Sequence, residues 1–180
     1  MHREWLLVLR CTAAGVVSRV ASTRCPIGRC STRPTMTPDL NVLLAASRTD
    51  HPHHAPALAW LKKALADCAT GGSLELLPMV TAGFLRLATS PKIFAKPTPF
   101  QAAVEFIDSL LLIPGVETPE LGREWPTLRE LATRLELCGN DMTDAWIAAA
   151  VRTLGTHLVT FDLGFSRMLS RSELTTLSPV

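Results

Sequence analysis

The sequence contains no tyrosine, and aromatic residues make up only 6% of its 180 positions. A platform of aromatic rings that stacks on single-stranded nucleic acid is therefore not expected. No run of about 18 apolar residues occurs, so we predict no membrane-spanning segment. The five cysteines form no C-x-x-C pair, which favours reduced, buried or incidental thiols in a cytoplasmic protein.

Several motifs that mark well-known active sites are also missing. There is no nucleophile elbow for Ser/His/Asp catalysis, no G-x-x-x-x-G-K-[ST] phosphate loop and no G-x-G-x-x-G fingerprint. His51, His53 and His54 lie close together, but no cysteine or fourth ligand accompanies them at a spacing typical of zinc sites. We interpret these histidines as loop and capping residues.

The composition is that of a folded domain with an unusual N-terminal end. Hydrophobic residues make up 47% of the chain and charged residues 19%, which is enough apolar material for a sizeable core. Residues 1–35 carry six Arg and one acid (net +5), whereas residues 36–180 carry 12 Lys and Arg against 15 acids (net −3). We predict a domain over residues 36–180 and an extension, 1–35, that is disordered or not translated. Because the domain is mildly acidic, any contact with nucleic acid needs a local basic patch.

Hydrophobic periodicity and turn residues predict strands that alternate with helices. The expected strands are Pro34–Asp39, Leu74–Leu77, Val116–Thr118, His157–Phe161 and Leu174–Leu177. The expected helices are Leu40–Ser47, His54–Cys68, Met79–Ala88, Phe100–Leu112, Trp125–Cys138, Met142–Leu154 and Leu163–Leu169. This alternation predicts an α/β fold with a short parallel sheet flanked by helices on both faces. Such sheets bind ligands beyond the carboxyl ends of their strands.

Three aspartates, Asp39, Asp144 and Asp162, stand beside apolar stretches in different parts of the chain. Asp39 and Asp162 follow predicted strands, and Asp144 begins a predicted helix, so all three can meet at one edge of the sheet. A carboxylate beside a buried stretch is costly unless a positive or hydrogen-bonding group meets it. Oxygen ligands suit Mg²⁺ or Mn²⁺ better than zinc, so we predict a shared cation site.

Each aspartate also has a purely structural interpretation. Asp39 is a good N-cap for the helix that follows it, and Asp162 is a good N-cap or turn residue. Asp144 in the first turn of a helix interacts favourably with the helix dipole. The sequence alone leaves both interpretations open.

Four stretches together resemble one known family. They are M-T-P-D-L-N-V-L-L-A-A with D-H-P-H-H after it, V-T-A-G-F-L-R-L-A-T-S-P-K-I-F, D-A-W-I-A-A-A and L-V-T-F-D-L-G-F. In this order and spacing they resemble the PIN domain, in particular the VapC-type toxin ribonucleases, from Met36 to Val180. The resemblance implies a three-layer sandwich and an Mg²⁺-dependent endoribonuclease, with Mn²⁺ as an alternative ion. It also implies a small antitoxin partner and a homodimer.

Carried over by position, the resemblance makes Asp39, Asp144 and Asp162 catalytic residues and metal ligands. Thr160 matches a small hydroxyl residue often found two positions before the last acid. The chain departs from the family where a helix glutamate is common, at Gly83, and where a second acid often follows Asp162, at Gly164.

These departures leave the expected site poorer in carboxylates, and other residues are candidates to support it. Asp141 lies one turn from Asp144 and could compensate. Arg86 could stabilise phosphate charge or form a structural ion pair. Lys92 and Lys96 could contact the RNA backbone or simply lie in a solvated loop. The alternative to an enzyme is a catalytically weakened PIN-fold protein that binds RNA or an antitoxin without cleaving.

Overall fold

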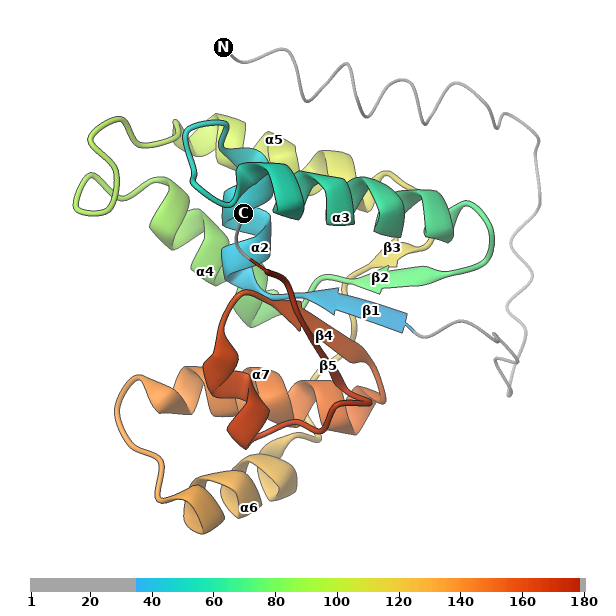
Figure 1. Ribbon diagram of the computed structural model, residues 1–180, viewed down its shortest axis with the longest axis vertical. Coiled ribbons are helices and arrows are strands. Elements are labelled where there is room, and N and C mark those ends of the chain that lie inside the picture. Colours follow the sequence, from blue (N-terminus) through green and yellow to red (C-terminus); the bar gives the residue numbers. More distant parts are fainter. Residues whose placement is uncertain (1–34, 179–180) are drawn as a thin grey trace.

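The structure is a computed structural model that describes residues 35–178. Apart from Thr35, the extension predicted for residues 1–35 lies outside the described residues. Five parallel strands form one sheet in the order β3-β2-β1-β4-β5. Figure 1 shows helices α2 to α5 on one face of this sheet and α6 and α7 on the other. The predicted α/β sandwich with a parallel sheet is confirmed.

All of the predicted strands and helices are present. The strands are β1 (Thr35–Pro38), β2 (Ser73–Glu75), β3 (Val116–Glu117), β4 (His157–Thr160) and β5 (Leu174–Thr176). The helices are α2 (Leu40–Ser47), α3 (His54–Cys68), α4 (Pro78–Ala88), α5 (Phe100–Leu111), α6 (Trp125–Leu135), α7 (Asp141–Leu154) and the short 3₁₀ helix η1 (Leu163–Arg167).

Two helices differ from the sequence-based expectation by more than one residue or in type. Helix α6 ends at Leu135 rather than at Cys138, because Glu136 adopts a left-handed conformation with φ of 51°. The segment expected to be a helix over Leu163–Leu169 is a 3₁₀ helix that stops at Arg167. Neither difference moves a predicted site residue.

The core lies on both faces of the sheet, and α2 and α7 each contribute a run of buried residues to it. Val42, Leu43 and Ala45 of α2 are fully buried, as are Ala148 and Ala149 of α7. A helix buried on most of its faces needs little polar character, which explains the apolar stretches that adjoin the aspartates in the sequence. Within residues 35–178, no helix is long and apolar enough to cross a membrane.

Candidate functional site

The central strand β1 pairs with β2 on one side and with β4 on the other, which makes the β1–β4 boundary the point where the order of the strands reverses. Pro38 of β1 is in register with Val159 of β4. Asp39 follows β1 directly, and its backbone N–H donates to the Val159 carbonyl at 2.8 Å. Asp162 follows β4 two residues after Thr160. Two predicted site aspartates therefore emerge from neighbouring strand ends, where parallel sheets bind their ligands.

Asp39 is the most buried of these acids, with only 4% of its surface exposed. Its Oδ1 accepts a 2.6 Å hydrogen bond from the backbone N–H of Leu40, so it caps α2. Its Oδ2 accepts a 2.6 Å hydrogen bond from the Thr160 hydroxyl. Among residues 35–178, no Lys, Arg or His side chain forms an ion pair with this carboxylate. The capping interpretation holds, but capping occupies only one of the two oxygens.

The fully buried Thr160 hydroxyl joins the two strand ends. It donates to Asp39 and accepts hydrogen bonds from Asn41 Nδ2 and from the backbone N–H of Asp162, both at 2.9 Å. A hydroxyl has one proton and two lone pairs, so all of its hydrogen-bonding capacity is used. The structure therefore gives Thr160 a positioning role between Asp39 and the segment that carries Asp162.

Asn41 is a member of this network that sequence reasoning missed. Its amide nitrogen binds Thr160, and its Oδ1 accepts from the backbone N–H of Phe161 at 3.2 Å. Asparagine is unfavourable inside helices because its side chain competes for backbone groups. An asparagine two residues after Asp39, in an otherwise apolar helix, was the signal that could have identified it.

The electrostatics of the site show that the acids act on one another. Burial raises the pKa of Asp39 from 3.8 to about 6; the hydrogen bonds from Thr160 and Leu40 oppose this rise, and the charges of Asp144 and Asp162 add to it. Burial also raises the pKa of Asp144, with further contributions from the charges of Asp162 and Asp141. The structure thus brings the predicted acids within electrostatic range of each other at one edge of the sheet.

The remaining acids are more accessible than Asp39. Asp144 is half-buried in the first turn of α7, and Asp141 is exposed in the same turn. Asp162 is exposed and caps η1, with its Oδ1 accepting from the backbone N–H of Gly164 at 2.7 Å. The solvent exposure of the carboxylates therefore increases across the site, from the buried Asp39 to the solvated acids at its rim.

The acids do not form a preformed cage. Within residues 35–178, no group of three or more His, Cys, Asp or Glu side chains is arranged to hold a metal ion. The roles of Asp39, Asp144 and Asp162 as metal ligands stay a prediction. The described residues include no cation site built from the three neighbouring histidines either.

The histidines have structural contacts instead. His51 Nδ1 accepts from the backbone N–H of His53 at 3.1 Å, and His54 Nδ1 is 2.9 Å from the Ala45 carbonyl oxygen. The His53 ring stacks on Phe161 with centroids 4.8 Å apart. These contacts agree with the predicted loop role. His53 occupies the N-cap position of α3, but its side chain makes no capping hydrogen bond.

Helix α4 passes beside the start of α2. A Cβ atom added at Gly83 would lie 3.5 Å from Leu40 Cδ2, an ordinary contact distance. Gly83 is therefore next to the residue that follows Asp39, in the place where the family resemblance implies a glutamate. Arg86, one turn further along α4, is exposed and forms no ion pair with another residue of the described range.

Comparison with known sequences agrees with this architecture. Residues 36–169 match the PIN domain. The VapC ribonuclease Mb2897 of Mycobacterium bovis is 35% identical over 130 residues, which cover 72% of this chain and 86% of that protein. Ribonuclease VapC31 of Mycobacterium tuberculosis is 35% identical over 135 residues, covering 73% of this chain and 92% of that protein.

Solved structures show the same fold at lower sequence identity. VapBC2 from Rickettsia felis, bound to a DNA fragment from its promoter, aligns with a TM-score of 0.55 and 18% identity over 80% of this chain and 99% of that chain. VapC20 of Mycobacterium tuberculosis, a toxin that cleaves the sarcin-ricin loop, aligns with a TM-score of 0.51 and 16% identity over 74% of this chain and 92% of that chain. With a matched family over most of the domain and relatives at 35% identity, this chain belongs to the PIN domain family, among its VapC-type members.

Proposed function

We propose that this protein is a toxin ribonuclease that cuts RNA phosphodiester bonds at the carboxyl edge of its sheet, with a divalent cation, Mg²⁺ or Mn²⁺, as cofactor. The observation that carries the proposal is the buried carboxylate of Asp39. It is 4% exposed, it has no cationic partner among residues 35–178, and its pKa is raised to about 6 by burial and by the neighbouring acids. Relatives named as VapC ribonucleases support the same activity.

The residues of the site fit a hard divalent cation. Asp39, Asp144 and Asp162 supply only oxygen donors, which Mg²⁺ and Mn²⁺ prefer. Mg²⁺ usually keeps several waters and binds through one or two carboxylates, so the lack of a closed three-residue cage is compatible with it. An ion beside Asp39 would also offset the burial and the like charges that together raise the pKa of this carboxyl.

Each residue then has a defined task. Asp39 and Asp144 would hold the cation, and Asp162 would complete the site directly or through water, with Asp141 as a further negative charge at the rim. A bound divalent cation supplies Lewis-acid neutralisation of phosphate charge and activates water for hydrolysis. Thr160 holds Asp39 in one orientation through its 2.6 Å hydrogen bond. Arg86, exposed and unpaired with the described acids, would neutralise phosphate charge.

The partners and location follow from the same proposal. VapBC2 of Rickettsia felis and VapBC-1 of nontypeable Haemophilus influenzae, which this chain resembles in fold, are VapBC structures by title. By analogy, this chain would bind a small cognate antitoxin that blocks the site, form a homodimer and act on RNA in the cytoplasm.

Gly83 favours the rival proposal, a PIN-fold protein that binds RNA or an antitoxin without cleaving. Expression of the chain in a bacterial host distinguishes the two. The enzyme predicts growth arrest by the unchanged chain and none by Asp39→Ala or Asp144→Ala. Asp108→Asn, which removes an exposed carboxylate on α5, is the control and should still cause arrest. Normal growth with every variant, together with RNA binding by the purified protein, would favour the rival.

A further inference from the structure

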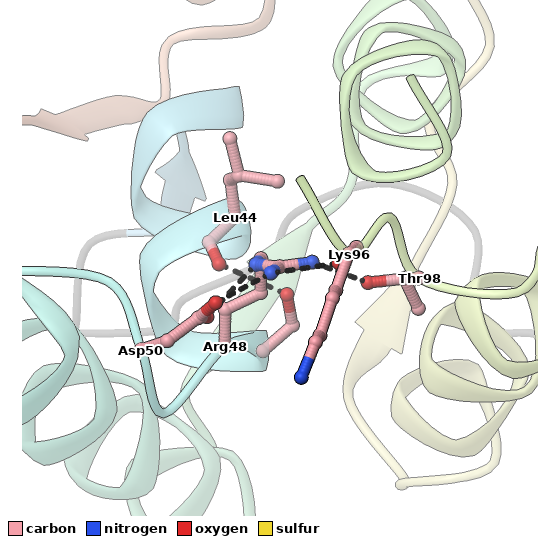
Figure 2. A network of polar contacts seen from close by, with 6 residues as sticks. Leu44, Arg48, Asp50, Lys96 and Thr98 are labelled. Carbon is pink, nitrogen blue, oxygen red and sulfur yellow. Dashed lines mark hydrogen bonds and ion pairs between the residues drawn. The ribbon is translucent and has the colours of Figure 1, made fainter. Parts of the chain in front are cut away.

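The connection between α4 and α5, residues 89–99, is held against the C-terminal end of α2 by one side chain. Arg48 is the C-cap of α2 and is only 8% exposed. Figure 2 shows its guanidinium group between Asp50 on one side and the backbone of Lys96 and side chain of Thr98 on the other. A buried arginine that binds partners in two separate loops holds those loops together, unlike a solvated arginine on the surface.

All three guanidinium nitrogens of Arg48 donate hydrogen bonds, toward Asp50 on one side and toward the loop on the other. Toward Asp50, Nε and Nη2 donate to the two carboxylate oxygens at 3.0 and 2.6 Å. Toward the loop, Nη1 donates to Thr98 Oγ1 at 3.0 Å and Nη2 to the Lys96 carbonyl at 3.1 Å. The Phe94 ring lies against the flat face of the group, with its centroid 3.7 Å from Cζ. Three loop residues therefore converge on one guanidinium group.

The fastened loop bears exposed cations. Lys92 and Lys96 are exposed and form no ion pair with other described residues, and Ile93 between them is 54% exposed. In Figure 1 the loop projects from the side of the molecule toward which the strands point their carboxyl ends. Since residues 36–180 carry a net charge of −3, these lysines, like the exposed Arg86 of α4, are local positive charges on an acidic domain.

The loop is linked to opposite ends of α2, the helix that Asp39 caps. Its N-terminal end continues α4, whose Gly83 lies against Leu40 beside Asp39. Its C-terminal half is held by Arg48, at the opposite end of the helix that Asp39 caps. An eight-residue helix is about 12 Å long, a separation that a short stretch of RNA backbone can span.

We propose that Arg48 is a positioning residue for RNA: by holding the loop of residues 89–99, it fixes Lys92 and Lys96 where they contact the phosphates that flank the scissile bond. This inference rests on the ribonuclease function proposed above. Arg48 does not touch the substrate itself. Its fork cannot be replaced by the single ammonium group of lysine, so Arg48→Lys keeps the charge and releases the loop.

The test measures RNA binding without cleavage, in a chain that carries Asp39→Asn throughout. Binding of a short single-stranded RNA is followed by fluorescence anisotropy between 50 and 200 mM salt. Replacing Lys92 and Lys96 with Ala should reduce the slope of log K against log salt by about 1.4, as expected for two lost phosphate contacts. Replacing Lys62 and Lys63, two exposed lysines of α3, should leave the slope unchanged.

We call the contacts of Arg48 with Phe94, Lys96 and Thr98 the clamp. The decisive readout is whether the clamp and the two lysines affect RNA binding independently or through one another. In the Arg48→Lys chain the slope should already be reduced, and the double replacement of Lys92 and Lys96 should change it little further. Thr98→Val and Phe94→Leu, which weaken the clamp from the loop side, should act in the same direction if Arg48→Lys does not fold. Trypsin should cut after Lys92 faster in each clamp variant than in the parent.

Two outcomes overturn the inference. One is a parent-like slope in all clamp variants, and the other is an equal effect of the lysine replacements with and without the clamp. If the parent binds no RNA at all, the ribonuclease proposal itself fails. If RNA binds but replacing Arg48 changes neither the affinity nor its salt dependence, only the positioning role is excluded. A cleavage assay with Asp39 intact should show a higher KM and a nearly unchanged kcat for Arg48→Lys.

Discussion

Thr160 and Asp39 are 121 positions apart in the sequence, and the hydroxyl of the first donates a 2.6 Å hydrogen bond to the carboxylate of the second. The bond crosses from β4 to the end of β1, where the order of the strands reverses. It is one of two hydrogen bonds that stabilise the charged form of Asp39 against the effect of burial. The candidate site is therefore built on the junction of two neighbouring strands.

Replacing Thr160 with valine should disturb stability and chemistry together. Valine has nearly the same shape but leaves Asp39 Oδ2, Asn41 Nδ2 and the Asp162 N–H without their shared partner. We expect a loss of about 2–4 kcal/mol in the free energy of unfolding, and a further rise in the pKa of Asp39. Urea denaturation and an RNA cleavage assay would measure the two effects.

Serine at position 160 and valine at position 156 provide the controls. Thr160→Ser keeps the hydroxyl and should retain cleavage. Thr156→Val breaks another buried hydroxyl pair, in which Thr37 donates to Thr156 at 3.0 Å, and should leave the pKa of Asp39 unchanged. Equal loss of cleavage in Thr156→Val and Thr160→Val would mean that the hydroxyl acts only through general stability.

The raised pKa of Asp39 predicts that stability decreases as the pH rises. The folded state holds the proton with a pKa of about 6, against an ordinary value of 3.8 for an aspartate. The contribution of this group is therefore fully present below about pH 4 and is lost as the pH rises through about 6, for a total of about 3 kcal/mol. In a chelating buffer, the difference in unfolding free energy between Asp39→Asn and the parent should change over this pH window and be constant above it.

At pH 7 without divalent cations, Asp39→Asn should be the more stable protein. Asparagine is as good an N-cap as aspartate, and it removes the cost of a buried charge while losing one of two hydrogen bonds. We expect a net gain of about 1–2 kcal/mol. A loss of stability would show that the carboxylate is better compensated than its surroundings indicate.

Asp144 should influence the titration of Asp39 more than Asp162 does. Both charges raise the pKa of Asp39, and Asp144 contributes the more of the two, although burial remains the largest cause. Asp144→Asn should lower the pKa of Asp39 by a few tenths to about one pH unit, and Asp162→Asn should lower it less. Carbon-13 NMR of the Asp39 carboxyl in a metal-free buffer would measure both values. No change in either variant would contradict the proximity of the acids.

The main features of the fold were predictable because they depend on local patterns. Apolar runs such as the one after Asp39 and the one after Asp144 identified α2 and α7, and the alternation of strands and helices identified the parallel sheet. The end of α6 was not predictable, because nothing in the residue type of Glu136 requires the left-handed conformation it adopts. Where a helix ends without Gly or Pro, tertiary packing decides the position of its end, and such packing cannot be inferred from neighbouring residues.

The aspartates of the candidate site were predictable from the sequence, but the residues that hold the surrounding segments in place were not. Asp39, Asp144 and Asp162 stand out because a charge beside an apolar stretch is costly. Asn41 and Arg48 depend on partners about 120 and 50 positions away, at Thr160 and Thr98. No spacing rule connects such residues, so their roles emerge only when the strands and loops are assembled.

Gly83 offers a direct way to add the carboxylate that the site lacks. A Cβ there meets Leu40 at an ordinary distance, so Gly83→Ala should stabilise the helix by about 0.5–1 kcal/mol. Gly83→Glu should bind Mn²⁺ about tenfold more tightly than the parent, because more ligand charge strengthens the binding of hard cations. Gly83→Gln, which has the same shape without the charge, separates charge from packing. Equal Mn²⁺ affinity for the Glu and Gln variants would place position 83 outside the cation site.

If Asp39 is a ligand of the cation, the binding of Mg²⁺ should be coupled to the release of its proton. At pH 6 Asp39 should be about half protonated, so the binding of Mg²⁺ must displace about half a proton from it. Calorimetry in two buffers with different ionisation heats measures this number. We expect release of about 0.5 proton per ion by the parent and, in Asp39→Asn, both weaker binding and no such release. Binding of Mg²⁺ without proton release, or with equal affinity in Asp39→Asn, would contradict it.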